Sequence, residues 1–240
     1  MRKILSVWIP YELTNDNKKK RVECCTEDLC LKNELGEEEW RRRYITTDET
    51  WVSFSPKPWR SDLRQWTAKD VPRPRAIQAK DRGKRTLLMI AFSYDGKFAI
   101  QETEKGEKID SERYQKFVQY AMDKFRRERH GRIRQQDIIW RQDNARPHVS
   151  RSTMNFFETK DIQLSYQAPY SPDLNGCDRW INKHLKSCLK ERTFDSLDGL
   201  LQSARQVLKD VSEDQLHREM MNFFNHCEHV IEAHGDYTVQ

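Results

Sequence analysis

Three aspartates stand at positions where a carboxylate could take part in chemistry. Asp48 lies inside a β-branched and aromatic segment, Asp143 ends the apolar run DIIWRQD, and Asp178 shares a helical stripe with apolar residues three, seven and eleven positions later. An inward-facing carboxylate needs a partner or a metal ion. The end of a strand, where Asp143 falls, is where ligands collect in open α/β sheets. Two or three convergent carboxylates would form the oxygen-rich ligand set that binds Mg²⁺.

Structural explanations for these acids remain open at this point. The chain carries 38 acidic residues among 240, so an acid at any chosen separation says little. Asp48 could be an exposed strand residue beside Glu49, and Asp178 could stabilise a helix N-terminus through its charge. Placement alone therefore does not decide between one shared site and three unrelated side chains.

The elements that must position these acids follow from the periodicity of the chain. Apolar residues every three or four positions predict helices, and β-branched runs predict strands. Asp95-Gly96 between two apolar runs predicts a β-hairpin. The expected strands are 44–54, 86–94, 97–102, 137–142 and 162–166, and the expected helices are 15–31, 109–129, 147–160, 178–190, 196–209 and 213–233. This order predicts an α/β fold with a ribonuclease-H-like, five-stranded mixed sheet flanked by helices.

Basic residues are concentrated in one proline-containing segment. The formal net charge is +5, yet residues 57–85 hold ten basic residues against three acidic ones, and residues 124–134 hold six against one. Residues 55–85 contain four prolines and little periodicity, which is typical of a long loop. Such clusters are the electrostatic signature of polyanion binding, although a solvated loop would have the same composition.

Composition argues against several other classes. Charged residues make up 34% of the chain, and the longest apolar run, residues 87–92, is far shorter than the ~20 residues of a membrane helix. We expect no membrane span and no signal peptide at the N-terminus. The six cysteines show no paired zinc-ligand spacing, so we expect reduced intracellular thiols. His226 and His229 lack a second ligand pair, which argues against a zinc site there.

Three motifs give this chain a family resemblance. TTDETW (46–51), QDNARPH (142–148) and YSPDL (170–174), followed by Asp178, resemble the catalytic core of mariner transposases. That family has 34 residues between its second and third aspartates, as do Asp143 and Asp178 here. WIPYEL (8–13) is similar to the family's WVPHEL linker motif. The resemblance runs from about Trp8 to Tyr237 and implies a linker and entry helix over 1–43, then a ribonuclease-H-like catalytic domain over 44–240.

The resemblance implies a metal-dependent DNA transposase. Asp48, Asp143 and Asp178 would be the catalytic residues and would hold two Mg²⁺ or Mn²⁺ ions. The enzyme would cleave double-stranded DNA at transposon inverted repeats and transfer the strand into TA target sites, without a covalent enzyme intermediate. The resemblance further implies a homodimer in the full-length form, action in the nucleus and no membrane partner.

Further contact residues are implied by position in the family pattern. The segment at about 55–85 corresponds to a clamp loop that reaches the partner subunit and DNA, and Trp8, Pro10 and Leu13 of the linker would form a docking surface. Asn144, Arg146 and His148 flank Asp143 and could contact the metal ions or DNA, or form the turn and helix start with Pro147 at the first helical position. For His148 we favour the turn. The implied DNA contacts are Lys57, Arg60, Arg64, Arg73, Arg75, Lys80, Arg82, Lys84, Arg85 and Arg146.

The chain also departs from the family pattern. Thr47 stands where the family usually has Gly, and Asn175-Gly176 stand where it has Ala-Pro, which suggests a less restricted turn before Asp178. The family carries two helix-turn-helix modules before the linker, where this chain begins. A second hypothesis is therefore a domesticated or truncated, non-catalytic DNA-binding or assembly derivative. Retention of all three aspartates favours the active enzyme.

Overall fold

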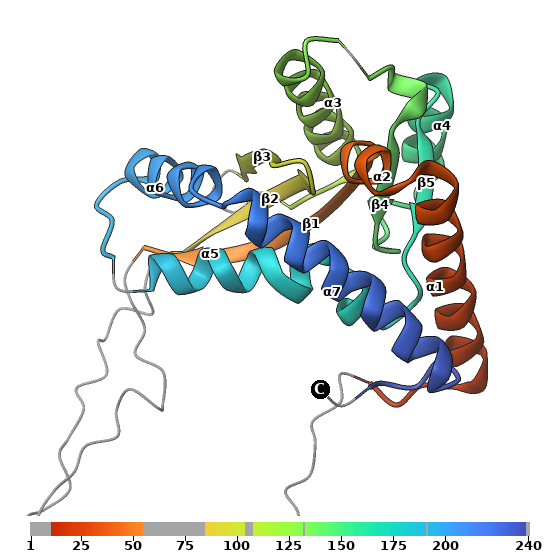
Figure 1. The fold of residues 1–240 in the computed structure, drawn as a ribbon. Coiled ribbons are helices and arrows are strands. Elements are labelled where there is room, and N and C mark those ends of the chain that lie inside the picture. Colours follow the sequence, from red (N-terminus) through yellow and green to blue (C-terminus); the bar gives the residue numbers. More distant parts are fainter. Residues whose placement is uncertain (1–10, 55–84, 104–107, 132, 191, 239–240) are drawn as a thin grey trace, which may run out of the picture.

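A five-stranded mixed sheet forms the centre of the protein (Figure 1). The structure is a computed structural model that describes residues 11–54, 85–103, 108–131, 133–190 and 192–238. The strand order is β3-β2-β1-β4-β5. β1 (Tyr44–Ser53), β2 (Arg85–Ser93) and β3 (Lys97–Glu102) are antiparallel neighbours. β4 (Ile139–Gln142) and β5 (Gln163–Tyr166) run parallel to β1. The mixed sheet that the order of elements predicts is confirmed.

Helices cover both faces of the sheet. α1 (Asn15–Leu35), α2 (Glu37–Arg43), α5 (Asn182–Leu189), α6 (Leu197–Lys209) and α7 (Glu213–Glu232) contribute to one core, and α3 (Ser111–Glu128) and α4 (Arg151–Thr159) to the other. Along β2, Leu88 and Ile90 enter the first core, whereas Met89 and Ala91 enter the second. This alternation explains why β2 reads as a continuous apolar run: a strand buried on both faces needs apolar residues at every position.

Most predicted elements are present, and the differences have local causes. α1 begins at Asn15 with Thr14 as its cap, as expected, but runs on to Leu35, and the short helix α2 was not predicted. α4 begins at Arg151 rather than at residue 147, because Ser150 is the residue whose side chain accepts a hydrogen bond from the Thr153 backbone N–H. The helix expected from Asp178 starts as a π-helical turn, η3 (Cys177–Ile181), before α5.

The hairpin and the second basic segment are linked. Gly96 adopts a positive φ of 82° in the β2–β3 turn, as the Asp-Gly pair predicts, but the loop is one residue longer than expected, because Ser93 pairs with Lys97 and Tyr94 joins the turn. Arg129, which caps α3, donates to the Asp95 carboxylate at 2.9 Å and to the Ser93 hydroxyl at 2.6 Å. Lys124 pairs with Glu128, and Arg134 pairs with Asp137. These three of the six basic residues in 124–134 therefore already have acidic partners.

No described helix is both long and apolar enough to cross a membrane. The six cysteines are all free thiols. Of the loop predicted over 55–85, residues 55–84 lie outside the described residues, and Arg85 begins β2. The linker residues Trp8 and Pro10 also lie outside them, and Leu13 is half-buried.

Candidate active site

Two of the three predicted aspartates lie side by side. Asp48 is on the central strand β1, opposite Ile90 of β2, and Asp178 lies in the π-helical turn η3. The Asn182 amide Nδ2 joins them: it donates to Asp48 Oδ2 at 3.0 Å and lies 3.4 Å from Asp178 Oδ1. Two residues far apart in the sequence thus form one acidic unit, the Asp48–Asp178 pair.

The Asp48–Asp178 pair carries an electrostatic cost. Burial, the charge of Asp178 and a hydrogen bond with that carboxyl together raise the pKa of Asp48 far above its usual range. Two carboxyl groups this close cannot both ionise without a counter-charge. Close approach of the two carboxylates is therefore favourable only with a proton or a cation between them.

The third aspartate stands at the corresponding end of the neighbouring strand. In the parallel β1–β4 register, the last residues to pair are Thr46 and Arg141, so Asp48 and Asp143 each lie two residues further along their strands. Neighbouring strands are about 4.8 Å apart. Asp143, which directly follows β4, thus lies at the same edge of the sheet as Asp48.

His148 holds the Asp143 carboxylate. Its Nδ1 lies 2.6 Å from Asp143 Oδ1, its Nε2 lies 3.2 Å from Glu49 Oε1, and its ring stacks on Tyr114 with centroids 3.9 Å apart. Burial alone would raise the pKa of Asp143, but the hydrogen bond and charge of His148 and the Ala145 backbone N–H lower it. For His148, burial opposes protonation, yet the bonds to Asp143 and Glu49 raise its pKa to about 9.

The three aspartates do not form a ready-made cage. Among the described residues, no three His, Cys, Asp or Glu side chains are arranged to hold one ion together. The structure joins Asp48 to Asp178 and places Asp143 at the same sheet edge, bound to His148. Their shared role in metal binding stays a prediction.

The turn before Asp178 is tied to the central strand. Asn175 Oδ1 accepts hydrogen bonds from Thr46 Oγ1 at 3.0 Å and from the Cys177 backbone N–H at 2.9 Å. Gly176 has a φ of −59°, and a Cβ there would lie 2.8 Å from Tyr94 Oη. Asn175 and Gly176, two departures from the family pattern, therefore supply specific hydrogen bonding and close packing. The π-helical turn that follows is a feature often found at functional sites.

Asp173 of the YSPDL motif has a structural role. Its carboxylate accepts two hydrogen bonds from the Arg21 guanidinium, at 2.8 and 2.7 Å, and one from His226 at 2.8 Å. Arg21 is fully buried and also donates to the Gly235 carbonyl. This ion cluster of Arg21, Asp173 and His226 fastens the motif to α1 and α7.

Sequence reasoning missed part of the site. Asn182 follows Asp178 by four positions, a spacing that places both on one helix face and could have been noticed. His148 was expected to serve the turn, but its ring contacts Asp143 and Glu49. Glu49 carried no signal of its own, because its partner is 99 residues away.

Only two of the predicted DNA contacts fall within the described residues. Arg85 begins β2 on the surface, with its guanidinium 4.3 Å from the centre of the Trp51 ring, and Arg146 is exposed in the turn after Asp143. The other predicted contacts, within residues 57–84, lie outside the described residues.

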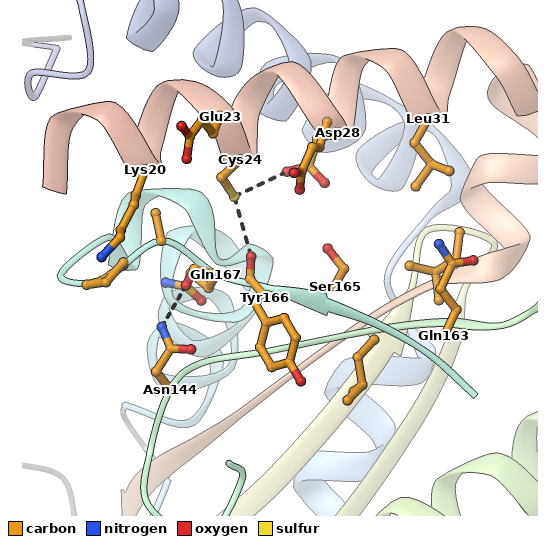
Figure 2. Close-up of a pocket in the computed structure, with 15 residues that line it drawn as sticks. Lys20, Glu23, Cys24, Asp28, Leu31, Asn144, Gln163, Ser165, Tyr166 and Gln167 are labelled. Carbon is orange, nitrogen blue, oxygen red and sulfur yellow. Dashed lines mark hydrogen bonds between the residues drawn. The ribbon is translucent and has the colours of Figure 1, made fainter. Parts of the chain in front are cut away.

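A separate hollow of about 610 Å³ lies between α1 and β5 (Figure 2). Lys20, Glu23 and Asp28 of α1 line one side, and Tyr166 and Asn144 the other. None of the three predicted catalytic aspartates lines it, so this hollow is distinct from the acidic edge of the sheet.

The strand order and the helices on both faces define a ribonuclease-H-like fold. The three acids lie on β1, directly after β4 and in the π-helical turn η3. Residues 44–201 match the family model described as DDE superfamily endonuclease. The chain belongs to this family.

Relatives support the assignment. The chain is 28% identical over 197 residues to the Mariner Mos1 transposase of Drosophila mauritiana, covering 80% of this chain and 54% of that protein. It is 25% identical over 235 residues to the histone-lysine N-methyltransferase SETMAR of Homo sapiens, covering 98% of this chain and 34% of that protein. The chain thus spans about a third to a half of these curated relatives.

Solved structures agree on the fold. A pre-cleavage Mos1 transpososome superposes with a TM-score of 0.85 at 21% identity, covering 100% of this chain and 68% of that chain. The isolated catalytic domain of Mos1 superposes with a TM-score of 0.74 at 20% identity, covering 97% of this chain and 100% of that chain. The predicted ribonuclease-H-like fold is confirmed.

Proposed function

We propose that this chain is the catalytic part of a DNA transposase that cleaves transposon ends and joins them to TA target sites. The observation that carries the proposal is the meeting of Asp48 and Asp178 at the sheet edge where Asp143 also ends its strand. Family membership supports DNA cleavage, and the similarity to Mos1 supports transposition. The proposed partners are double-stranded DNA and, in the full-length protein, a second copy; the proposed location is the nucleus.

The donor set fits a divalent cation. Burial and repulsion from neighbouring carboxylates, Asp178 first and Glu49 after it, raise the pKa of Asp48, and a bound cation would relieve that repulsion. Asn182 Oδ1, beside the pair, is buried without a hydrogen-bond partner among the described residues. Carboxylate and amide oxygens are what Mg²⁺ and Mn²⁺ bind. Mos1 complexes have been solved with Mg and with Mn, which favours the same ions here.

In the proposed mechanism, Asp48, Asp143 and Asp178 would hold two Mg²⁺ or Mn²⁺ ions, which supply activation of the attacking oxygen and neutralisation of the leaving oxygen. The chain's own side chains position these carboxylates. His148 keeps Asp143 ionised by hydrogen bonding, and Asn182 orients Asp48 and Asp178 toward each other. Reaction then requires positioning and charge neutralisation at phosphorus rather than a covalent intermediate.

Replacement of Asp143 tests the proposal. With Mg²⁺ or Mn²⁺, the wild-type protein should nick supercoiled plasmid and join oligonucleotides with free 3′-hydroxyls to target DNA, and Asp143→Asn should reduce both to background. Asp137→Asn is the matched control, because Asp137 forms a surface ion pair with Arg134 away from the acidic edge. Thermal unfolding should show that both variants remain folded.

The second candidate is the non-catalytic derivative, favoured by the engagement of Asp143 with His148. Metal-independent DNA binding with no cleavage by the wild type, or cleavage by Asp143→Asn equal to wild type, would refute the enzymatic proposal. The first of these outcomes would support the derivative.

A further inference from the structure

Asn182 occupies an unusual position beside the Asp48–Asp178 pair. It is the first residue of α5, and only 5% of its surface is exposed. Its Nδ2 reaches both carboxylates, at 3.0 Å from Asp48 Oδ2 and 3.4 Å from Asp178 Oδ1. Its Oδ1 is buried and has no hydrogen-bond partner among the described residues.

An orphaned amide oxygen in the interior requires an explanation. Leaving a buried acceptor unpaired is costly, and native structures contain few such groups. The other end of the same amide points at two acids of the predicted metal site. The unpaired Oδ1 therefore belongs to a side chain, Asn182, that already contacts the predicted metal site.

The amide of asparagine can present either end to the pair. Its χ2 torsion is broad and roughly two-fold, so a half-turn exchanges Oδ1 and Nδ2 with little change in shape. Without a cation, the NH₂ end is the favourable one, because carboxylate oxygens accept hydrogen bonds. With a cation between the carboxylates, the NH₂ dipole would be repelled and the carbonyl oxygen attracted.

We propose that Asn182 is a cation ligand: its NH₂ group spans Asp48 and Asp178 when no ion is bound, and its Oδ1 turns to the ion when one binds. The inference rests on the proposed function, to which it adds a fourth, neutral oxygen donor. A neutral donor gives a divalent ion another oxygen without adding a third negative charge to the Asp48–Asp178 pair.

Metal binding separates this role from a purely structural one. Mn²⁺ is titrated into the protein, and binding is followed by calorimetry and electron paramagnetic resonance. Asn182→Leu should bind Mn²⁺ about ten-fold more weakly than the wild type does. Asn182→Asp, which keeps an oxygen at this position, should bind Mn²⁺ at least as tightly as wild type. Asn155→Leu, at an exposed asparagine of α4, is the matched control and should bind like wild type.

A spectroscopic measurement on the wild type avoids any folding defect of the variants. Titration with diamagnetic Mg²⁺ should shift the Asn182 side-chain ¹³Cγ and NH₂ resonances, whereas those of Asn155 should stay in place. Equal Mn²⁺ affinity of Asn182→Leu and wild type, or Asn182 resonances unmoved at saturating Mg²⁺, would overturn the assignment.

The same titration keeps the two proposals apart. If Asp48→Asn abolishes Mn²⁺ binding while Asn182→Leu leaves it intact, the metal site stands and only the role of Asn182 fails. If the wild type itself binds no Mn²⁺ or Mg²⁺, both the role of Asn182 and the proposed metal-dependent function fail.

Discussion

Gly176 shows how closely single residues behind the acidic edge are packed. It stands two positions before Asp178, and a Cβ there would meet Tyr94 Oη at 2.8 Å, Thr46 Cγ2 at 3.1 Å and Phe92 Cζ at 3.2 Å. Its φ of −59° would suit any residue, so the requirement for glycine is steric rather than conformational. The space is limited by residues of β1 and β2 and by Tyr94, which follows β2, and these strands carry and support Asp48.

Gly176→Ala should therefore destabilise the protein by about 1–3 kcal/mol, the usual range for overpacking a core. Because the turn must move, DNA nicking should fall as well. Urea unfolding and the plasmid assay would measure the two effects. Gly199→Ala in α6 is the matched control, because the Cβ would meet only the side-chain oxygen of Ser196 and alanine favours a helix, so it should not lower stability or DNA nicking. Equal stability of the two variants would contradict the steric argument.

At this scale the sequence identified the acids but not their partners. Asp48, Asp143 and Asp178 stood out by their placement, but only the family motifs around them singled out one shared site, which stays a prediction. His148 and Glu49 meet only through the tertiary fold, as do Asn182 and Asp48, which are 134 residues apart. Local periodicity contains no information on such pairs.

Among the elements, α1, the YSPDL turn and α7 are joined by one buried ion cluster. Arg21 is fully buried, and its guanidinium donates to Asp173 and to the Gly235 carbonyl. Although burial opposes ionisation, the hydrogen bonds and charges of Arg21 and His226 lower the pKa of Asp173 to about 2. The cluster thus holds the segment that leads into Asp178 against the long helices α1 and α7.

Asp173→Asn should cost about 3–5 kcal/mol of unfolding free energy, because it leaves the Arg21 charge buried without its partner. Asp16→Asn, which removes a surface pair with Lys20, should change stability little. Denaturant unfolding of both variants at neutral pH provides the measurement. A loss no larger for Asp173→Asn than for Asp16→Asn would show that the cluster is not stabilising.

The same cluster predicts a pH dependence with a definite sign. The pKa of Asp173 is lower in the folded state than the ~3.9 of an unfolded aspartate, so its stabilisation is complete above about pH 4 and is lost as pH falls toward 2. Wild type should lose stability over this window, and Asp173→Asn should lose less. If the free energy of unfolding fell by the same amount in both proteins between about pH 4 and 2, the lowered pKa of Asp173 would not be the cause.

The elements were easier to predict than their ends. The hairpin rests on Asp95-Gly96, and Thr14 caps α1 at its predicted start, so local chemistry was sufficient there. The helices expected from residues 109 and 196 begin one or two residues later, after the caps Asp110 and Ser196. α2 is only seven residues long and follows Gly36 directly, which concealed it. The π-helical turn at Asp178 depends on packing against β1 and β2, which no local pattern encodes.

The division at residue 43 stays a prediction, although α1 and α2 contribute Cys24, Cys25 and Trp40 to the first core.

For the whole molecule, the question is whether DNA affinity follows net charge or the distribution of charge. The net charge of +5 is modest, and three of the six basic residues in 124–134 form ion pairs with acidic side chains of the same chain. The 57–85 segment holds ten basic residues against three acidic ones. If that segment is the DNA-binding surface, its charges should matter far more than equal charges elsewhere.

Two variants with the same net charge distinguish the possibilities. The first replaces five basic residues of the 57–85 segment with Gln, and the second does the same to five exposed basic residues on the helices, so both lower the net charge equally. The first set is Arg73, Arg75, Lys80, Arg82 and Lys84; the second is Lys19, Lys116, Lys186, Lys209 and Arg218.

The first variant should bind a short duplex much more weakly than wild type. Its plot of log affinity against log salt should flatten by about 0.9 for each phosphate that the protein no longer neutralises. The second should keep a slope close to that of wild type, because long-range charge is screened within about 10 Å at 0.1 M salt. Equal weakening in both variants would mean that overall charge, rather than the 57–85 segment, governs DNA binding.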